Sequence, residues 1–243
     1  TITTTNTTPN YIDDVMWVDW IEPVQTNLLV YYNIDDVNSY NFASVKTTLT
    51  NVASSGGYGG TIDLTGGTYP QDVSSNPSTL CGYGSDSNGK FLYMTQSTNL
   101  PQIKINQTVS LTNWSAQFKV KNRGEGNYPR FLGTRNYRME LVYRNGNIWY
   151  YQSGWVNTGV SYPNDGNYHI ITFTYQNSPK EFKIYVDGVL EYTITTKGTT
   201  LVSSSYFWIF GSQDRRQEKS YFNKFLLYSK TLTQSEININ NNI

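Results

Sequence analysis

The chain has 243 residues, of which 15% are charged and 15% are aromatic, and its formal net charge is zero. This length suits one large all-β domain around a single core. The neutral balance lacks the basic field that non-specific nucleic-acid binding requires, so no nucleic-acid partner is expected. A surface of Asn, Thr, Ser and Tyr instead suits neutral polar partners such as glycans or other proteins.

The cysteine content and the hydropathy of the chain limit which covalent links, metal sites and membrane segments it can have. Cys81 is the only cysteine, so the sequence predicts neither an intramolecular disulfide nor a cysteine zinc site. No stretch approaches the roughly 20 apolar residues of a membrane span, so no membrane insertion is expected, and no basic-then-apolar signal segment opens the chain. Because the chain begins at Thr1 rather than Met, we expect a processed product or an excised piece of a larger protein.

The N-terminal part differs in composition from the rest of the chain. Residues 1–25 are predicted to be a polar arm followed by a leading strand, and residues 26–243 a single sandwich domain. Thr1 to Asn10 has no apolar residue except Ile2, so it cannot offset its own chain entropy by burial. The apolar run from Val15 to Ile21 is short enough to be an edge strand or a lid.

Strand patterns dominate the remaining sequence. Leu28 to Tyr32 predicts a core strand, whereas the Gly-, Ser- and Asn-rich region from Asn33 to Gly89 predicts mainly loops, with short strands around Ile62 and Leu64 as its only regular structure. From Lys90 onward, runs of about five to nine residues alternate with turn signals, which is typical of a β-sandwich. The candidate strands are 91–94, 114–121, 130–133, 138–143, 147–151, 169–175, 181–186, 190–195, 206–211 and 222–228.

Local signals also predict two turns and a helix. Asn145-Gly146 and Asp187-Gly188 are dipeptides typical of tight hairpin turns. Thr233 to Asn238 is the one segment that we predict to be helical, because Thr233 and Glu236 have the spacing of a capping box.

Several of these segments resemble laminin-G-like domains of the concanavalin A-like lectin/glucanase fold. The most specific match is Leu227-Tyr-Ser-Lys-Thr-Leu-Thr-Gln-Ser-Glu-Ile237. The resemblance is strong after Ser110, as in Leu111 to Val120 and Phe182-Lys-Ile-Tyr-Val-Asp-Gly188, and loose before it, as in Leu28 to Asp35. It implies an all-β jelly-roll sandwich of two curved antiparallel sheets. Members of the family include glycan-binding lectins, adhesion modules, some glycosidases and domains on phage and virus surface proteins, and fold alone does not choose among them.

Acidic residues show no sign of the glycosidase chemistry known in this fold. That chemistry places paired carboxylates on one strand face, which requires even spacing, and no two acidic residues here lie at positions i and i+2. The Glu-x-Asp-x-x-Glu signature is also missing, so we predict a non-catalytic protein, with carboxylates that meet across strands as the alternative. We expect His169, the only histidine, to pack on a sheet face, since no Gly-x-Ser-x-Gly accompanies it.

No cofactor is expected, with calcium as the alternative. Lectins of this fold often bind calcium through Asp and Asn in loops. Asp35-Asp36, Asp86-Ser-Asn88 and Asp165-Gly-Asn167 could supply such ligands. We favour the other interpretation, in which these segments are ordinary turns whose side chains bond their own backbone.

Aromatic residues provide the best candidate binding site. The cluster Trp149-Tyr-Tyr-Gln-Ser-Gly-Trp155 places rings on both faces of a hairpin, so half of them should point away from the core. Sugar rings stack on such aromatics while nearby polar groups bind the hydroxyls. The alternative is that these rings only pack on the sandwich face. The predicted ligand-binding residues are Trp149, Tyr151, Trp155, Asn157, Tyr162, Asn164, Asp214, Arg215 and Arg216.

These features lead to a functional hypothesis. We expect a non-catalytic binding or structural module on a virion or phage surface, or extracellular, as part of a fibre, tail or capsid decoration. Its expected partners are a host cell-surface glycan or other virion proteins, and it could form an oligomer. The alternatives are a bacterial surface lectin or carbohydrate-binding module and, with less support, a glycosidase of the same fold.

Overall fold

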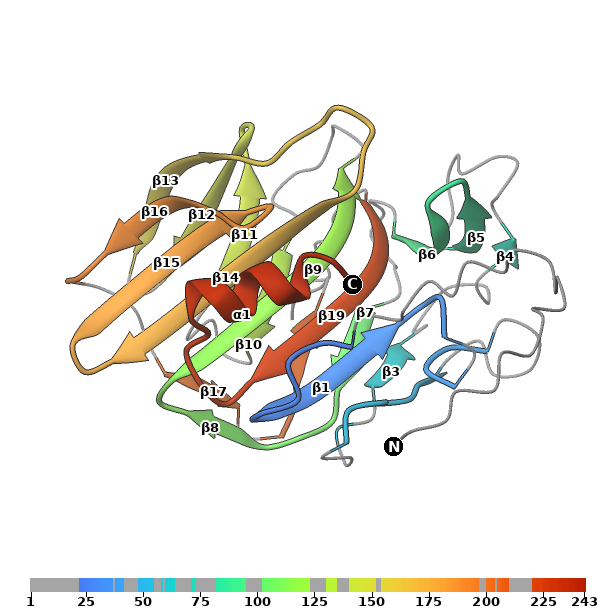
Figure 1. Ribbon diagram of the computed structural model, residues 1–243, viewed down its shortest axis with the longest axis horizontal. Helices are drawn as coiled ribbons and strands as arrows, with labels where there is room; N and C mark the ends of the chain where they lie inside the picture. The colour runs from blue at the N-terminus through green and yellow to red at the C-terminus, as the bar shows by residue number, and fades with distance from the viewer. Residues whose placement is uncertain are drawn as a thin grey trace, which may run out of the picture.

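The described part of the chain is an all-β sandwich with one short helix (Figure 1). The computed structural model describes residues 22–36, 38–41, 48–54, 58, 60–63, 71, 72, 82–94, 102–122, 130–134, 140–151, 154–196, 200–203, 205–209 and 220–243. The predicted arm Thr1 to Asn10 and leading strand Val15 to Ile21 therefore lie outside the described residues, as do Asp214, Arg215 and Arg216.

One layer of the sandwich is a nine-stranded sheet in which only β4 and β5 pair in parallel. In spatial order its strands are β16 (Val189–Ile194), β15 (Lys180–Val186), β14 (His169–Asn177), β9 (Trp114–Asn122), β19 (Ser220–Tyr228), β6 (Gly89–Met94), β5 (Gly82–Asp86) and β4 (Gln71–Asp72), and β1 (Leu28–Asn33) also pairs with β19. Every residue of β19 is buried. This strand is therefore the centre of the layer.

The second layer is an eight-stranded sheet. Its strands, in spatial order, are β13 (Trp155–Ser161), β12 (Asn147–Tyr151), β11 (Glu140–Arg144), β10 (Arg130–Thr134), β18 (Phe207–Ile209), β7 (Gln102–Ile105), β3 (Gly60–Asp63) and β2 (Thr48–Leu49). A small ribbon of β8 (Val109–Leu111) and β17 (Leu201–Ser203) completes the strands. Strand β13 is an edge of its sheet.

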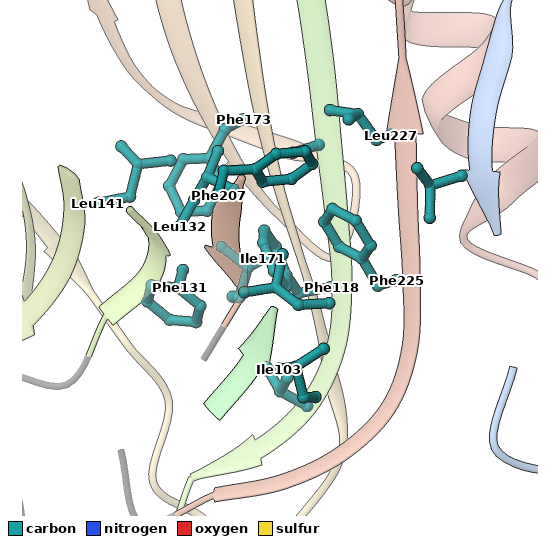
Figure 2. Close-up of a cluster of buried hydrophobic side chains, with 14 of the residues drawn as sticks. Ile103, Phe118, Phe131, Leu132, Leu141, Ile171, Phe173, Phe207, Phe225 and Leu227 are labelled. Atoms are coloured by element: carbon teal, nitrogen blue, oxygen red, sulfur yellow. The ribbon is translucent and has the colours of Figure 1, made fainter. Parts of the chain in front are cut away.

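The core lies between the two sheets and is rich in aromatic rings (Figure 2). Phe118, from the nine-stranded sheet, has its ring centroid 5.6 Å from that of Phe131 in the eight-stranded sheet. The ring centroids of Phe173 and Phe225 lie 6.0 Å and 4.9 Å from that of Phe118. Burying each such ring contributes about 1.5–3 kcal/mol, so this cluster is a main source of adhesion between the layers.

Both predicted hairpin turns are confirmed. Asn145 and Gly146 connect β11 to β12 with φ angles of 51° and 81°, and Asp187 and Gly188 connect β15 to β16 with φ angles of 50° and 80°. Positive φ at both central positions matches the right-handed twist of the flanking strands, and the Asn-Gly and Asp-Gly sequences accept it at low cost.

The helix and its capping box are also confirmed. Helix α1 (Gln234–Asn240) begins after Thr233, whose hydroxyl accepts a hydrogen bond from the Glu236 N–H, while the Glu236 carboxylate accepts one from the Thr233 N–H. The helix lies on the outer face of the nine-stranded sheet (Figure 1), where the buried Asn240 Nδ2 donates to Gln117 Oε1 at 2.6 Å. No helix in the described part of the chain is long and apolar enough to cross a membrane.

The structure also corrects parts of the strand prediction. Short strands β2, β4 and β5 occur in the region that was expected to be mainly loops, whereas β3 lies where a short strand was expected around Ile62. Strands β7, β8, β13 and β17 were not among the candidates. These strands are two to seven residues long, and most are too short to display a period of two. They exist because partner strands satisfy their backbone groups rather than because of their own propensity.

Candidate functional site

The hairpin formed by β12 and β13 presents one face to the core and one face outward. Ile148 and Tyr150 are buried, whereas Trp149 and Tyr151 are partly exposed. Cross-strand pairing places Asn157 opposite Trp149 and Trp155 opposite Tyr151. Because side chains alternate along a strand, these four residues share the outward face. We call Trp149, Tyr151, Trp155 and Asn157 the hairpin platform.

Trp155 is the exposed element of the hairpin platform. Its side chain is 40% exposed, although it belongs to the largest apolar type. The ring centroid lies 5.0 Å from that of Tyr151 with an interplanar angle of 56°, a tilted aromatic contact. Tyr151 thus supports one side of the indole, and the solvent-facing part of that ring is available to a ligand.

Trp149 is held in place by the neighbouring strand. Its Nε1 group donates a hydrogen bond to the Arg144 carbonyl oxygen at 3.0 Å. The Arg144 guanidinium lies over the same ring, 4.9 Å from its centroid, in a cation–π arrangement. These contacts restrict the indole to one orientation, and a pre-organised ring loses little entropy when a ligand stacks on it.

Asn157 adds polar capacity beside the rings. It is exposed, and its Oδ1 atom accepts a hydrogen bond from the Gly159 N–H at 2.9 Å. That bond orients the amide, and within the described residues its Nδ2 group makes no hydrogen bond of its own. Asn157 lies within strand β13. It can therefore offer two donor hydrogens to a hydroxyl at a fixed position.

Tyr162 was wrongly predicted to contact a ligand. Its side chain is 2% exposed, and its ring makes edge-to-face contacts with Phe131 at 5.1 Å and Tyr143 at 5.2 Å. Tyr162 lies two residues after the buried Val160, so both side chains point to the same, inner side of the sheet. Asn164 is exposed in the loop after β13, as a ligand contact would require.

His169, the first residue of β14, forms a clamp with two carboxylates. Its Nδ1 atom lies 2.7 Å from Asp187 Oδ2 and its Nε2 atom 3.0 Å from Asp165 Oδ1. Burial alone would lower the pKa of His169, but the hydrogen bonds and charges of Asp187 and Asp165 outweigh it, so the net pKa is raised. The same contact, with the bonds from Asn167, holds the pKa of Asp165 well below its usual range.

This clamp was invisible to sequence reasoning because it depends on folding. Asp165 lies in the loop before β14 and Asp187 in the turn between β15 and β16, so only the paired strands bring them to His169. The Asp187 Oδ1 atom also accepts a hydrogen bond from the Ile170 N–H at 2.8 Å. The arrangement fixes this end of the sheet through charge-assisted hydrogen bonds.

The one buried acidic side chain among the described residues is Glu140, which forms an ion pair with Arg130. The Arg130 Nη2 to Glu140 Oε2 distance is 3.0 Å, and the two side chains are 4% and 2% exposed. Glu140 lies opposite Tyr151 in the sheet, so the pair adjoins the hairpin platform on its outward face. A glycosidase acid must reach substrate and exchange a proton, whereas this carboxylate is engaged by a guanidinium.

The acidic loops considered for calcium form local turns in the structure. The Oδ1 atoms of Asp36, Asp86 and Asp165 each accept a hydrogen bond from the backbone N–H two residues later, at 2.8, 2.8 and 2.9 Å. This is the turn interpretation favoured from the sequence. Within the described ranges, no group of three or more His, Cys, Asp or Glu side chains is arranged to hold a metal ion.

Comparison with known protein families identifies the superfamily of the chain. The family model of the concanavalin A-like lectin/glucanases superfamily matches residues 95–238, more than half of the chain. The chain belongs to this superfamily. The resemblance inferred from the strand motifs is therefore confirmed, as is the expected all-β sandwich of two layers. No curated protein matches the sequence significantly.

Solved structures show the same fold at low sequence identity. Domain 4 of AbnA, an extracellular arabinanase from Geobacillus stearothermophilus, in complex with arabinotriose, aligns with a TM-score of 0.61 at 16% identity, over 87% of this chain and 97% of that one. The ligand binding domain of botulinum neurotoxin serotype D in complex with N-acetylneuraminic acid gives 0.58 at 15% identity, over 90% of this chain and 51% of that one.

A third structure, the binding domain of Paraclostridial mosquitocidal protein 1, gives a TM-score of 0.60 at 12% identity, over 89% of this chain and 52% of that one. The chain therefore spans about half the length of the two toxin domains and nearly all of the arabinanase domain. At these identities the likeness concerns the fold.

Proposed function

We propose that this chain is a non-catalytic glycan-binding module and that the hairpin platform is its contact surface. The observation that carries the proposal is the exposed Trp155, supported by Tyr151 on an edge hairpin and flanked by the oriented amide of Asn157. An indole face for sugar C–H groups beside a hydroxyl-binding amide is the combination that sugar recognition needs. The fold neighbours named for arabinotriose and N-acetylneuraminic acid complexes support the same class of ligand.

The non-catalytic part of the proposal is supported by the state of the acidic side chains. Glu140 is engaged by Arg130, and Asp165 and Asp187 both hold the ring of His169. Hydrolysis of a glycosidic bond needs two carboxylates on either side of the bond, one of them protonated. The lowered pKa of Asp165 suits a fixed anion rather than a general acid.

For its biological setting, we propose a surface module of a virus or phage particle that attaches to a host glycan or to other virion proteins. The support is the laminin-G-like character of the strands and the polar Thr- and Asn-rich start of the chain. A second setting is a carbohydrate-binding module attached to an extracellular enzyme, which the near-complete overlap with the arabinanase domain favours.

The proposal is tested by measuring glycan binding and thermal stability of the same variants. The wild-type protein should bind at least one ligand on a glycan array, and Trp155→Ala should weaken that binding by about 1–3 kcal/mol, the scale of a lost interface anchor. Leu190→Ala is the control, because Leu190 is 46% exposed on the other sheet. It should leave affinity unchanged.

Two outcomes would contradict this function. One is a Trp155→Ala protein that loses stability while its folded fraction binds as tightly as wild type, since the ring would then be structural. The other is an intact protein that binds no glycan. Release of reducing sugar from polysaccharides by the pure protein would contradict the non-catalytic part alone.

A further inference from the structure

The hairpin platform continues beyond its aromatic end as a strip of outward-facing side chains. In the register of β12 and β13, Tyr151 pairs with Trp155 and Asn147 pairs with Ser161. These two pairs are four residues apart along β12, a distance of about 13 Å at roughly 3.3 Å per residue. The strip is therefore longer than a single sugar ring.

The chemistry of the strip changes in order along its length. The Tyr151 and Trp155 pair is followed by Trp149 and Asn157, and then by Asn147 and Ser161. Stacking surfaces thus occupy two successive pairs, and hydrogen-bonding groups begin at the second and continue to the third. A ligand with several sugar residues would meet a ring at one end and amides and a hydroxyl toward the other.

Beside the exposed strand, the described residues leave open space at two glycines. A Cβ atom added at Gly154 or Gly159 would meet no atom within 4 Å. Gly159, with a φ of 73°, lies where β13 carries extra residues relative to β12, as the register shift shows. A closed pocket selects the end of a chain, whereas an open strip lets a chain continue past it.

Within the described ranges, the strip itself carries no ionised side chain. Its outward side chains are aromatic, amide or hydroxyl, and of the described ions beside it, Arg144 lies over Trp149 and Glu140 pairs with Arg130. We infer that the hairpin platform binds an extended neutral oligosaccharide lying along β13, rather than a single sugar residue or an acidic glycan. This inference rests on the proposed function and specifies its ligand class.

The test is a titration with oligosaccharides of increasing length, followed by calorimetry or tryptophan fluorescence. The probes are xylo-, arabino-, cello- and manno-oligosaccharides from the monosaccharide to the hexasaccharide, with oligogalacturonate as the acidic series. In at least one neutral series, affinity should rise roughly tenfold or more from monosaccharide to trisaccharide, the equivalent of one good contact. Sodium chloride should change that affinity little, because uncharged contacts are not screened.

Variants locate the bound chain. Asn147→Ala, at the pair of the strip farthest from Trp155, should reduce the affinity for the trisaccharide several-fold and leave the weak affinity for the monosaccharide unchanged. Asn88→Ala is the control, since Asn88 is an exposed asparagine in the turn between β5 and β6 of the other sheet. It should change neither affinity.

The outcomes separate this inference from the proposed function. If the protein binds a glycan with equal affinity at all lengths, or binds oligogalacturonate more tightly in a salt-dependent manner, the inference is overturned and the proposed function stands. Failure of all four neutral series also overturns it. If no glycan of any class binds, the proposed function fails as well.

Discussion

The buried ion pair between Arg130 and Glu140 allows a sharp test of the energetics. Glu140→Gln keeps the shape of the side chain but removes the negative charge that faces Arg130, whose side chain is 4% exposed. Breaking a buried pair from one side costs about 3–5 kcal/mol, because an uncompensated charge stays in a poorly solvated site. For a chain of this size, 1 kcal/mol shifts Tm by about 2–4 °C, so we expect Tm to fall by roughly 6–20 °C.

The measurement is urea unfolding, followed by far-UV circular dichroism, with Tm from a thermal scan. The matched control is Glu181→Gln, which breaks the Lys183–Glu181 pair, whose side chains are 26% and 28% exposed. An exposed pair contributes about 0–1 kcal/mol, so this control should stay close to wild type.

A double variant tells the charge effect from simple loss of packing. Replacing both partners, as in Arg130→Met with Glu140→Leu, should cost much less than Glu140→Gln alone, since no charge remains to be solvated. The reasoning is refuted if Glu140→Gln unfolds within about 1 kcal/mol of wild type, or if the double variant is the least stable of the set.

Three further predictions concern stability. The stability that the clamp on His169 contributes should be fully present below the unfolded-state pKa of about 6.5 and should be lost as pH rises through the raised folded-state pKa. The Tm difference between wild type and His169→Gln should therefore shrink from pH 6 to pH 9. A constant difference would contradict this. Gly188→Ala should cost about 1–3 kcal/mol of unfolding free energy, more than Gly146→Ala, because both positions have positive φ but only at Gly188 would a Cβ atom lie 2.3 Å from Asn241 Nδ2. Deleting Thr1 to Asn10, which lies outside the described residues, should leave Tm nearly unchanged, and a drop of several degrees would identify an integral strand.

Much of the sandwich could be predicted from local sequence because its central strands carry strong local signals. Strands β14 and β15 are rich in β-branched and aromatic residues, and β15 ends at an Asp-Gly turn, so propensity and turn chemistry agree. Strand β13 was missed because Asn157 and Gly159, which have low strand propensity, interrupt it. Pairing with β12 imposes the strand there, as tertiary context often does.

The candidate site was predictable only in part. The outward position of Trp155 followed from counting rings on a hairpin, whereas the burial of Tyr162 needed the exact phase of β13, which the sequence pattern left undefined. The Arg130–Glu140 pair and the clamp on His169 join residues from different elements. No local pattern could reveal them, because their energy depends on distances that exist only after the sheets form.

The position of β19 has a consequence for the order in which the protein can fold. Strand β19 lies between β9 and β6 and also pairs with β1, so β1 and β19 become neighbours although almost 200 positions separate them in the sequence. The Val24 N–H also donates a hydrogen bond to Asn240 Oδ1 over a separation of 216 residues. Closing such long loops costs entropy before any contact repays it, and chains dominated by non-local pairing fold slowly. During synthesis on the ribosome, β1, β6 and β9 would have to wait for residue 228 before their shared neighbour exists. Until then their unpaired edges are open to other chains, and a chaperone that shields them should raise the yield of native protein.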